Sequence, residues 1–224
     1  MTDRRGVAFF DVDETLVSVR TLESFLLYYL RLVPSMISQE GLRDLAAQVV
    51  QLDRAEFNRL YFSVWAGQPE DAVREAGRRW YAETSAEPGF YRPNLLERLR
   101  RHQADGDEVV LVSGSFDAPL RPLADDLGIE TLYRTELETE GGLYTGRIAR
   151  PMIGDDKKRA VEAYLDRFPS DAESWGYGDH SSDLPLLESV RHPVVVGSDP
   201  VMLDVAEERG WPVMPIEGDL APRA

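Results

Sequence analysis

The chain has 224 residues, 43% of them hydrophobic, and its 40 acidic side chains outnumber 25 basic ones to give a formal net charge of -15. This charge opposes the counterion release that drives nucleic-acid binding, so we expect no nucleic-acid partner. The sequence contains no cysteine and no apolar run of membrane-span length, which excludes disulfides and a cysteine nucleophile and leads us to expect a cytoplasmic protein without membrane association.

The first predicted element is a strand over residues 7–10, an apolar run that leads directly into Asp11 and Asp13. Two carboxylates at the end of a buried strand repel each other, and partial burial raises the free-energy cost of their charges. Such a pair is typical of a cation site or of a chemical task. The alternative interpretation is an acidic turn, in which an aspartate or Thr15 only caps the next helix.

Four amphipathic helices are predicted between about residues 18 and 86, because apolar residues recur at helical spacing and short polar segments separate them. We expect a small helical bundle inserted after the first strand, with its aromatic side chains in the core. The apolar faces comprise Leu22, Phe25, Leu26, Tyr29 and Leu30; Leu42, Leu45, Ala46, Val49 and Val50; Phe57, Leu60, Tyr61, Val64 and Trp65; and Val73, Ala76, Trp80 and Tyr81.

Helices and strands alternate from Pro93 onward. This alternation predicts an α/β fold, a Rossmann-like doubly wound parallel sheet with helices on both faces. We expect residues 1–17 and 87–217 to form this catalytic core, residues 18–86 to form the helical insertion, and residues 218–224 to be a flexible tail. The expected strands are 108–112, 129–133, 174–177, 194–196 and 212–214, the expected helices are 94–103, 118–127, 157–168, 184–190 and 201–209, and residues 136–151 should form a hairpin around Gly141 and Gly142.

Polar residues follow two more of the predicted strands. Ser113 and Gly114 end the strand at 108–112, and a hydroxyl beside an unhindered backbone suits a phosphate oxygen. Asp179 and Asp183 follow the strand at 174–177. Ligands of such a sheet bind beyond the carboxyl ends of the strands, so the three strand ends together predict a phosphoryl site. Taken singly, Ser113 could belong to an ordinary turn and Asp183 could be a helix cap.

Four segments resemble the motifs of the haloacid dehalogenase (HAD) superfamily, and within it the phosphoserine phosphatase-like group, subfamily IB, whose helical cap of the C1 type is inserted after the first motif. In order, they are FFDVDETL at residues 9–16, LVSGS at residues 111–115, Lys157, and GYGDHSSDLPLL at residues 176–187. The resemblance covers the chain from residue 7 to about residue 214. The first and fourth motifs are specific, whereas the second and third depend on order and spacing.

The resemblance implies a Mg²⁺-dependent phosphatase that works through an aspartyl-phosphate and acts on a small phosphorylated metabolite. Asp11 would attack phosphorus, and Asp13 would protonate the leaving oxygen and later deprotonate water. Mg²⁺ prefers oxygen ligands, and the carboxylates of Asp11 and Asp179 with the main-chain carbonyl of Asp13 would provide them.

The remaining roles implied by the resemblance concern the transferred phosphoryl group. Ser113, Gly114 and Lys157 would bind its oxygens as charge develops, and Asp183 would orient Lys157 or a metal-bound water. Lys158 is the competing candidate for the lysine. In the resembled group, apolar residues follow the lysine at positions three, four, seven and eight. The pattern favours Lys157, because those places then hold Ala160, Val161, Tyr164 and Leu165, whereas counting from Lys158 brings in Glu162 and Asp166.

Arg20 bears on the identity of the substrate. Phosphoserine phosphatases have a glutamate at this place that meets the substrate amine, and an arginine cannot pair with an ammonium group. L-phosphoserine is therefore disfavoured, and we expect Arg20 to contribute to substrate specificity. The alternative is a solvated arginine at the entrance of the helical insertion.

Several other functions share parts of this pattern. A phosphomutase or phosphotransferase of the same superfamily would use identical core residues. A receiver-type phospho-acceptor module also needs an acidic cluster, Mg²⁺, a hydroxyl and a lysine, but it lacks the inserted helices and the acid at Asp13. A haloacid dehalogenase would have no use for Asp13 or for a metal. The sequence leaves open whether the protein is a monomer or a homodimer.

Overall fold

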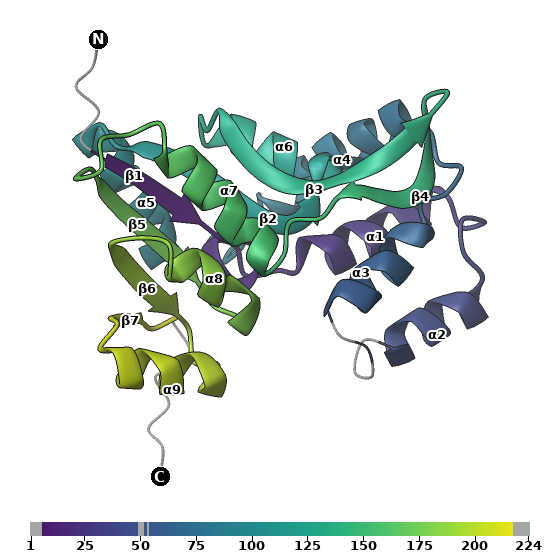
Figure 1. Cartoon of the computed structure of the whole chain (residues 1–224). Coiled ribbons are helices and arrows are strands. Elements are labelled where there is room, and N and C mark those ends of the chain that lie inside the picture. The colour runs from purple at the N-terminus through teal and green to yellow at the C-terminus, as the bar shows by residue number, and fades with distance from the viewer. Residues whose placement is uncertain (1–5, 49–51, 53, 217–224) are drawn as a thin grey trace.

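A seven-stranded, mostly parallel sheet lies at the centre of the computed structural model, which describes residues 6–48, 52 and 54–216 (Figure 1). The strand order is β4-β3-β2-β1-β5-β6-β7, and the β3–β4 pair is antiparallel. This sheet confirms the predicted α/β class. The strands are β1 (Gly6–Phe10), β2 (Glu108–Phe116), β3 (Thr131–Glu140), β4 (Leu143–Arg150), β5 (Glu173–Gly178), β6 (His192–Val196) and β7 (Val213–Met214).

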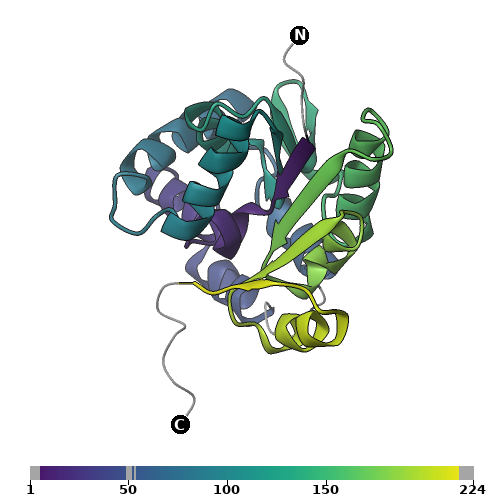
Figure 2. The same cartoon turned by 90° about the vertical axis from the view of Figure 1, so that its left-hand side faces the viewer.

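Helices cover both faces of the sheet (Figure 2). The alternation of side chains along a strand explains why, since Ala8 and Phe10 of β1 enter one hydrophobic core whereas Val7 and Phe9 enter the other. The first core lies against α5 (Pro93–Asp105) and α6 (Asp117–Asp126), and the second against α7 (Asp155–Leu165), α8 (Leu184–Leu187) and α9 (Pro200–Arg209).

Four α-helices of the described residues lie between β1 and α5, and we call residues 21–84 the helical insertion. They are α1 (Thr21–Leu32), α2 (Gln39–Gln48), α3 (Arg54–Ser63) and α4 (Glu70–Thr84). Aromatic rings fill the space between them, as Phe25 stacks on Trp65 with centroids 5.4 Å apart. Phe116 at the end of β2 lies 5.1 Å from Trp65, so the sheet contributes to the same cluster. Val49, Val50 and the expected tail at residues 218–224 lie outside the described residues.

The helical insertion is packed closely on the rest of the chain. A Cβ atom added to Gly77 of α4 would lie 2.0 Å from the carbonyl oxygen of Ala118 in α6, so glycine is required for this approach. The two segments that connect the helical insertion with the rest of the chain are hydrogen-bonded to each other. The Ser18 amide donates to the Phe90 carbonyl, and the Arg92 amide donates to the Leu16 carbonyl. None of the described helices is both long enough and apolar enough to span a lipid bilayer.

The β3–β4 hairpin differs from the expectation in length. The sequence predicted a strand at 129–133 and a separate hairpin at 136–151, but β3 runs without a break from Thr131 to Glu140. Likewise, β2 continues four residues past the predicted end at Val112, because Ser113 and Phe116 still pair with β3. The turn at Gly141 and Gly142 has φ values of 59° and 79°, a conformation that favours glycine in tight hairpins.

The far end of this hairpin reaches the helical insertion (Figure 1). The Gly67 amide donates to the Tyr144 carbonyl at 2.8 Å, the Tyr144 amide donates to the Gln68 carbonyl at 3.0 Å, and the Glu70 amide donates to the Gly142 carbonyl at 2.9 Å. The loop before α4 is thus paired with β4 through main-chain hydrogen bonds.

Candidate active site

The candidate site lies at the carboxyl ends of β1, β2 and β5, which are adjacent in the sheet. Asp11 follows β1 directly, and its amide donates to the Tyr177 carbonyl of β5 at 2.9 Å. Asp179 follows β5 in the same way. Parallel pairing therefore brings together polar residues that are 168 positions apart in the sequence, as expected for a ligand site of a doubly wound sheet.

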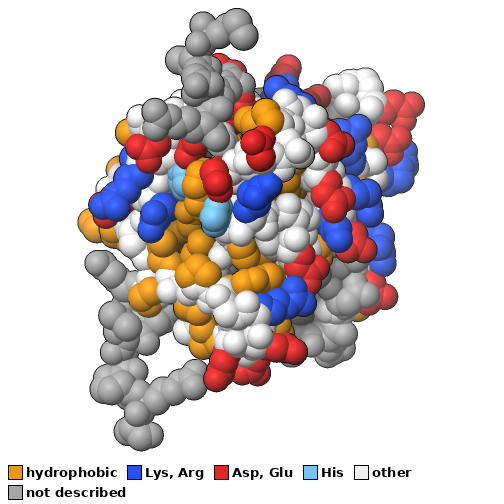
Figure 3. Space-filling model, turned by 60° about the vertical axis from the view of Figure 1, so that its left-hand side comes forward, with side chains coloured by type: hydrophobic (Ala, Val, Ile, Leu, Met, Phe, Trp, Pro, Cys, Tyr) orange, Lys and Arg blue, Asp and Glu red, His pale blue; other side chains and the backbone are white. Residues whose placement is uncertain are grey.

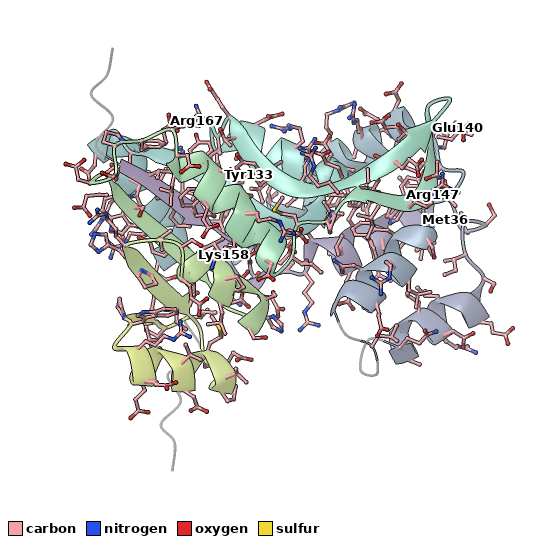
Figure 4. The ribbon with its side chains drawn as sticks, in the orientation of Figure 1. Met36, Tyr133, Glu140, Arg147, Lys158 and Arg167 are labelled. Atoms are coloured by element: carbon pink, nitrogen blue, oxygen red, sulfur yellow. The ribbon has the colours of Figure 1, made fainter. Side chains whose placement is uncertain are left out.

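Lys157 of α7 lies at the centre of this cluster and is only 3% exposed. Its Nζ donates to Oδ1 of Asp11 and to Oδ1 of Asp183, each at 2.5 Å. Lys158, labelled in Figure 4, has a side chain that is 41% exposed, with its Nζ 3.9 Å from Glu162. The structure thus places Lys157 among the carboxylates and Lys158 at the surface.

Burial and neighbouring charge control the ionisation of these groups. Burial raises the pKa of Asp11 well above its ordinary value, while the Lys157 ammonium acts in the opposite direction. Burial alone would lower the pKa of Lys157, but the carboxylates of Asp11 and Asp183 raise it, so this lysine stays charged. Burial, aided by repulsion from Asp183, raises the pKa of Asp179 to about 7. The cluster therefore holds more acidic groups than its single buried lysine balances.

The acidic groups form a set of ligands suited to a divalent cation. One carboxylate oxygen from each of Asp11, Asp179 and Asp183 lies within 4.8 Å of the others. The Thr15 hydroxyl donates to Asp179 Oδ1 at 2.7 Å and so orients that carboxylate. Both oxygens of Asp183 accept hydrogen bonds, from Lys157 and from the His180 amide, which leaves Asp11 and Asp179 better placed as ligands. A set of hard oxygens fits Mg²⁺.

Asp13 and Ser113 meet beside this cluster. The Ser113 hydroxyl donates to Asp13 Oδ2 at 3.1 Å, and the Thr21 amide donates to Asp13 Oδ1. Gly114 follows Ser113 in the same strand, and a Cβ atom added there would lie 3.1 Å from the Ile153 side chain. The second predicted motif is thus in contact with Asp13, the second aspartate of the first motif.

Arg20 has a partner that sequence inspection did not anticipate. Its Nε donates to Glu14 Oε2 at 2.7 Å, and the two side chains are 60% and 42% exposed. Glu14 has a φ of 58°, the left-handed region that non-glycine residues rarely adopt. This backbone conformation directs the chain after Asp13 so that Glu14 reaches Arg20. For Arg20 to contact a substrate, it must therefore either break its ion pair with Glu14 or bind Glu14 and the substrate together.

Three hydroxyl residues of the site were missed as functional candidates. Thr15 was considered only as a helix cap, although it holds Asp179. Thr21 and Ser115 are buried; the Thr21 hydroxyl donates to the Ser115 hydroxyl, and the Ser115 amide donates to the Ser113 hydroxyl. The proximity of Thr15 to Asp11 and of Ser115 to Ser113 in the sequence was the available signal, but the partners of a hydroxyl depend on tertiary structure.

The fold and site define a protein with a doubly wound α/β sheet and a carboxylate–lysine cluster at the carboxyl ends of its central strands. The sequence matches the family described as haloacid dehalogenase-like hydrolase over residues 8–188, and the chain belongs to this family. Within the family it is a phosphomonoesterase of the phosphoserine phosphatase-like kind, as the resemblance of the four motifs implied.

Relatives and solved structures cover nearly the whole chain. A histidinol-phosphatase of Neisseria meningitidis is 27% identical over 94% of this chain and 98% of its own length. A crystal structure of a protein with unknown function from Bordetella pertussis is 26% identical, covers 94% of this chain and 98% of that chain, and has a TM-score of 0.83. A structure of a phospho-aspartyl intermediate analogue of phosphoserine phosphatase, 16% identical, covers 97% and 95% with a TM-score of 0.68, and it shows the likeness of fold.

Proposed function

We propose that this chain is a Mg²⁺-dependent phosphatase that hydrolyses a small phosphorylated metabolite through an aspartyl-phosphate on Asp11. The observation that carries this proposal is the position of the Asp11 carboxylate, which is buried, bonded to Lys157 at 2.5 Å, and close to Asp179. A phosphoryl group is an anion and is repelled by the carboxylates of the site. Asp11 is therefore suited to attack it only if positive charge near Asp11 offsets this repulsion.

Asp11, Asp179 and the main-chain carbonyl of Asp13 would hold Mg²⁺, which when bound supplies positive charge against the phosphoryl oxygens. Lys157 would bind a phosphoryl oxygen, and the Ser113 hydroxyl and the main chain at Gly114 would bind the others. These groups come from α7 and β2, which are held in place by the surrounding core.

The reaction would proceed in two displacements. In the first, a carboxylate oxygen of Asp11 bonds to phosphorus, the bond to the leaving oxygen breaks, and Asp13 gives that oxygen a proton. In the second, Asp13 removes a proton from water, the water oxygen bonds to phosphorus, and inorganic phosphate leaves as Asp11 is regenerated. Asp183 would keep Lys157 in position through the 2.5 Å hydrogen bond.

The substrate is proposed only as a class. The relatives that are named for a substrate act on histidinol phosphate or phosphoserine by name. The Arg20 guanidinium beside Glu14 favours a substrate with a second polar group, since Arg20 could bind an anionic group and Glu14 a cationic one. L-histidinol phosphate therefore belongs in the first substrate panel, and O-phospho-L-serine, which Arg20 disfavours, is included for comparison.

Release of inorganic phosphate from a panel of phosphorylated metabolites, measured with Mg²⁺ and with EDTA, tests the proposal. We expect release from a subset of the panel with Mg²⁺ and its loss in EDTA. Release that persists in excess EDTA, or no release from any compound, would contradict the proposal. A phosphorylated isomer formed in place of phosphate would indicate a mutase, and a stably phosphorylated protein without turnover would indicate a phospho-acceptor module.

A further inference from the structure

Thr21 lies where the helical insertion begins and is fully buried. It is the first residue of α1, and the preceding residue, Arg20, provides no side-chain cap for the helix. The amide groups in the first turn of a helix have no partner within the helix. The Thr21 amide is one of these groups, and it donates to Oδ1 of Asp13, eight residues earlier in the chain.

The Thr21 hydroxyl makes a second contact with the site. It donates to the Ser115 hydroxyl at 2.7 Å, and both side chains are buried. The Ser115 amide in turn donates to the Ser113 hydroxyl at 3.1 Å, and that hydroxyl donates to Oδ2 of Asp13 at 3.1 Å. Asp13, Thr21, Ser115 and Ser113 thus form a closed circuit of hydrogen bonds, which we call the Asp13 circuit.

The two carboxylate oxygens of Asp13 accept hydrogen bonds from different kinds of donor. Oδ1 is bound by a main-chain amide, which cannot rotate away, whereas Oδ2 is bound by a hydroxyl that can. In the proposed reaction the Ser113 hydroxyl turns toward a phosphoryl oxygen. Oδ2 would then carry the transferred proton. The hydrogen bond from the Thr21 amide to Oδ1 sets the orientation of the Asp13 carboxyl group and so the direction in which Oδ2 points.

We infer that Thr21 is a positioning residue for Asp13, because its amide fixes Oδ1 and its hydroxyl anchors that amide to Ser115. This inference rests on the proposed role of Asp13 as the proton donor. A positioned proton donor matters most when the leaving oxygen is a poor leaving group and matters little when it is a good one. A merely structural role would affect both kinds of substrate alike.

The experiment compares kcat/KM for n-butyl phosphate, a poor leaving group, with that for 4-nitrophenyl phosphate, a good one. Thr21→Val keeps the shape and the amide but removes the hydroxyl. We expect it to lower kcat/KM for n-butyl phosphate by about tenfold, a fraction of what a full general acid contributes, and to change the value for 4-nitrophenyl phosphate by less than about twofold. Thr21→Ser, which keeps the hydroxyl, should restore both values.

Two further variants keep the test decisive. Ser115→Ala removes the hydroxyl partner from the other side and should give the same dependence on leaving group if Thr21→Val does not fold. Tyr61→Phe is the matched control, because the Tyr61 hydroxyl anchors the first turn of α1 at the Leu22 carbonyl without a bond to the Asp13 circuit. It should leave the ratio of the two kcat/KM values unchanged.

Asp13→Asn separates this inference from the proposed function. If Asp13→Asn shows the leaving-group dependence but Thr21→Val and Ser115→Ala lower both substrates equally, or neither, the inference about Thr21 is wrong and the role of Asp13 stands. If Asp13→Asn itself shows no such dependence, the assignment of Asp13 as proton donor fails, and the inference fails with it.

Discussion

The Nζ of Lys157 lies 2.5 Å from Oδ1 of Asp11, and the same ammonium group is shared with Asp183. Removing one partner from a buried ion pair leaves uncompensated charge in the interior, which commonly costs about 3–5 kcal/mol. Lys157→Met keeps most of the side-chain volume but leaves two buried carboxylates facing each other. We expect it to abolish phosphate release and to lower the free energy of unfolding by about 3 kcal/mol in the metal-free protein.

Lys158→Met is the matched control for this prediction. The two lysines are adjacent in sequence and lie in the first turn of the same helix, but the Lys158 side chain is exposed and its Nζ is 3.9 Å from Glu162. Exposed ion pairs of this kind contribute less than about 1 kcal/mol. Chemical denaturation and phosphate release should both be unchanged in Lys158→Met. Equal losses in the two variants would show that Lys157 has no special role.

Asp11→Asn tests the nucleophile. The amide has nearly the same shape as the carboxylate, and Lys157 keeps Asp183 as a carboxylate partner, so we expect the melting temperature to stay within about 5 °C of the parent. Phosphate release should fall below detection for every substrate, because an amide cannot form the aspartyl-phosphate. Turnover by a well-folded Asp11→Asn protein would reject the proposed intermediate.

Mg²⁺ binding should depend on pH through Asp179. Burial and Asp183 raise its pKa from 3.8 to about 7 in the absence of metal, so below this pH a cation must displace a proton. We expect the apparent Mg²⁺ association constant to fall by up to about tenfold per pH unit below 7 and to level off above it. Titration calorimetry at pH 6, 7 and 8 measures this. Asp179→Asn should weaken binding and reduce the pH dependence, of which Asp11, whose pKa burial also raises, keeps a part.

The stability of the metal-free protein should also depend on Asp179, but in the opposite direction, because it should fall as the pH rises. Because the pKa of Asp179 is higher in the folded than in the unfolded chain, the folded state binds the extra proton. The resulting stabilisation is present below about pH 4 and is lost as the pH rises through about 7. Mg²⁺ should therefore raise the melting temperature more at pH 8 than at pH 6. A larger shift at pH 6 would contradict this linkage.

Arg20→Ala tests the proposed contact with the leaving group. The loss of a charge-assisted hydrogen bond worth about 1.5–3 kcal/mol should lower kcat/KM on the best metabolite by about tenfold or more. Hydrolysis of 4-nitrophenyl phosphate, which lacks the recognised group, should be almost unchanged. Glu14→Gln releases Arg20 from its ion pair and is the companion variant. Equal losses on both substrates would assign Arg20 to the chemistry or the fold, and no loss on either would make it a solvated arginine.

Sequence patterns predicted the parts of the molecule that depend on local spacing. The apolar run before Asp11 predicted β1, and the alternation of strands and helices predicted the parallel sheet. Because parallel strands share one carboxyl edge, the sheet itself implied that residues after β1, β2 and β5 lie near one another. The register of α7 distinguished Lys157 from Lys158, since Lys157 shares the buried face of the helix with Ala160, Val161 and Tyr164.

Features that depend on distant partners were not predicted. Nothing local to Thr21 indicates that its hydroxyl will meet Ser115, because these residues are 94 positions apart. The pairing of Arg20 with Glu14 depends on a positive φ that is unusual for glutamate. The continuous β3 strand was missed because glutamates and threonines in residues 135–140 weakened its apolar alternation, while the antiparallel partner β4 stabilises it.

Acidic and basic side chains are interspersed on the face of the molecule shown in Figure 3. The formal charge of -15 repels a phosphorylated compound at a distance. Capture of substrate should therefore become faster as salt is added, because salt screens this repulsion. In the proposed function, Lys157 and the bound Mg²⁺ would provide the attraction at close range.

The pairing of the β3–β4 hairpin with residues 67–70 has a mechanical consequence. A helical insertion that is joined to the rest of the protein only by two adjacent connecting segments can rotate about them as a rigid unit. Here the connecting segments at Ser18 and Arg92 are supplemented by main-chain hydrogen bonds between Gly67 and Tyr144, in the loop before α4 and the β3–β4 hairpin. A third attachment resists such rotation, so a rotation of α1 and α4 that admits substrate must also bend the β3–β4 hairpin.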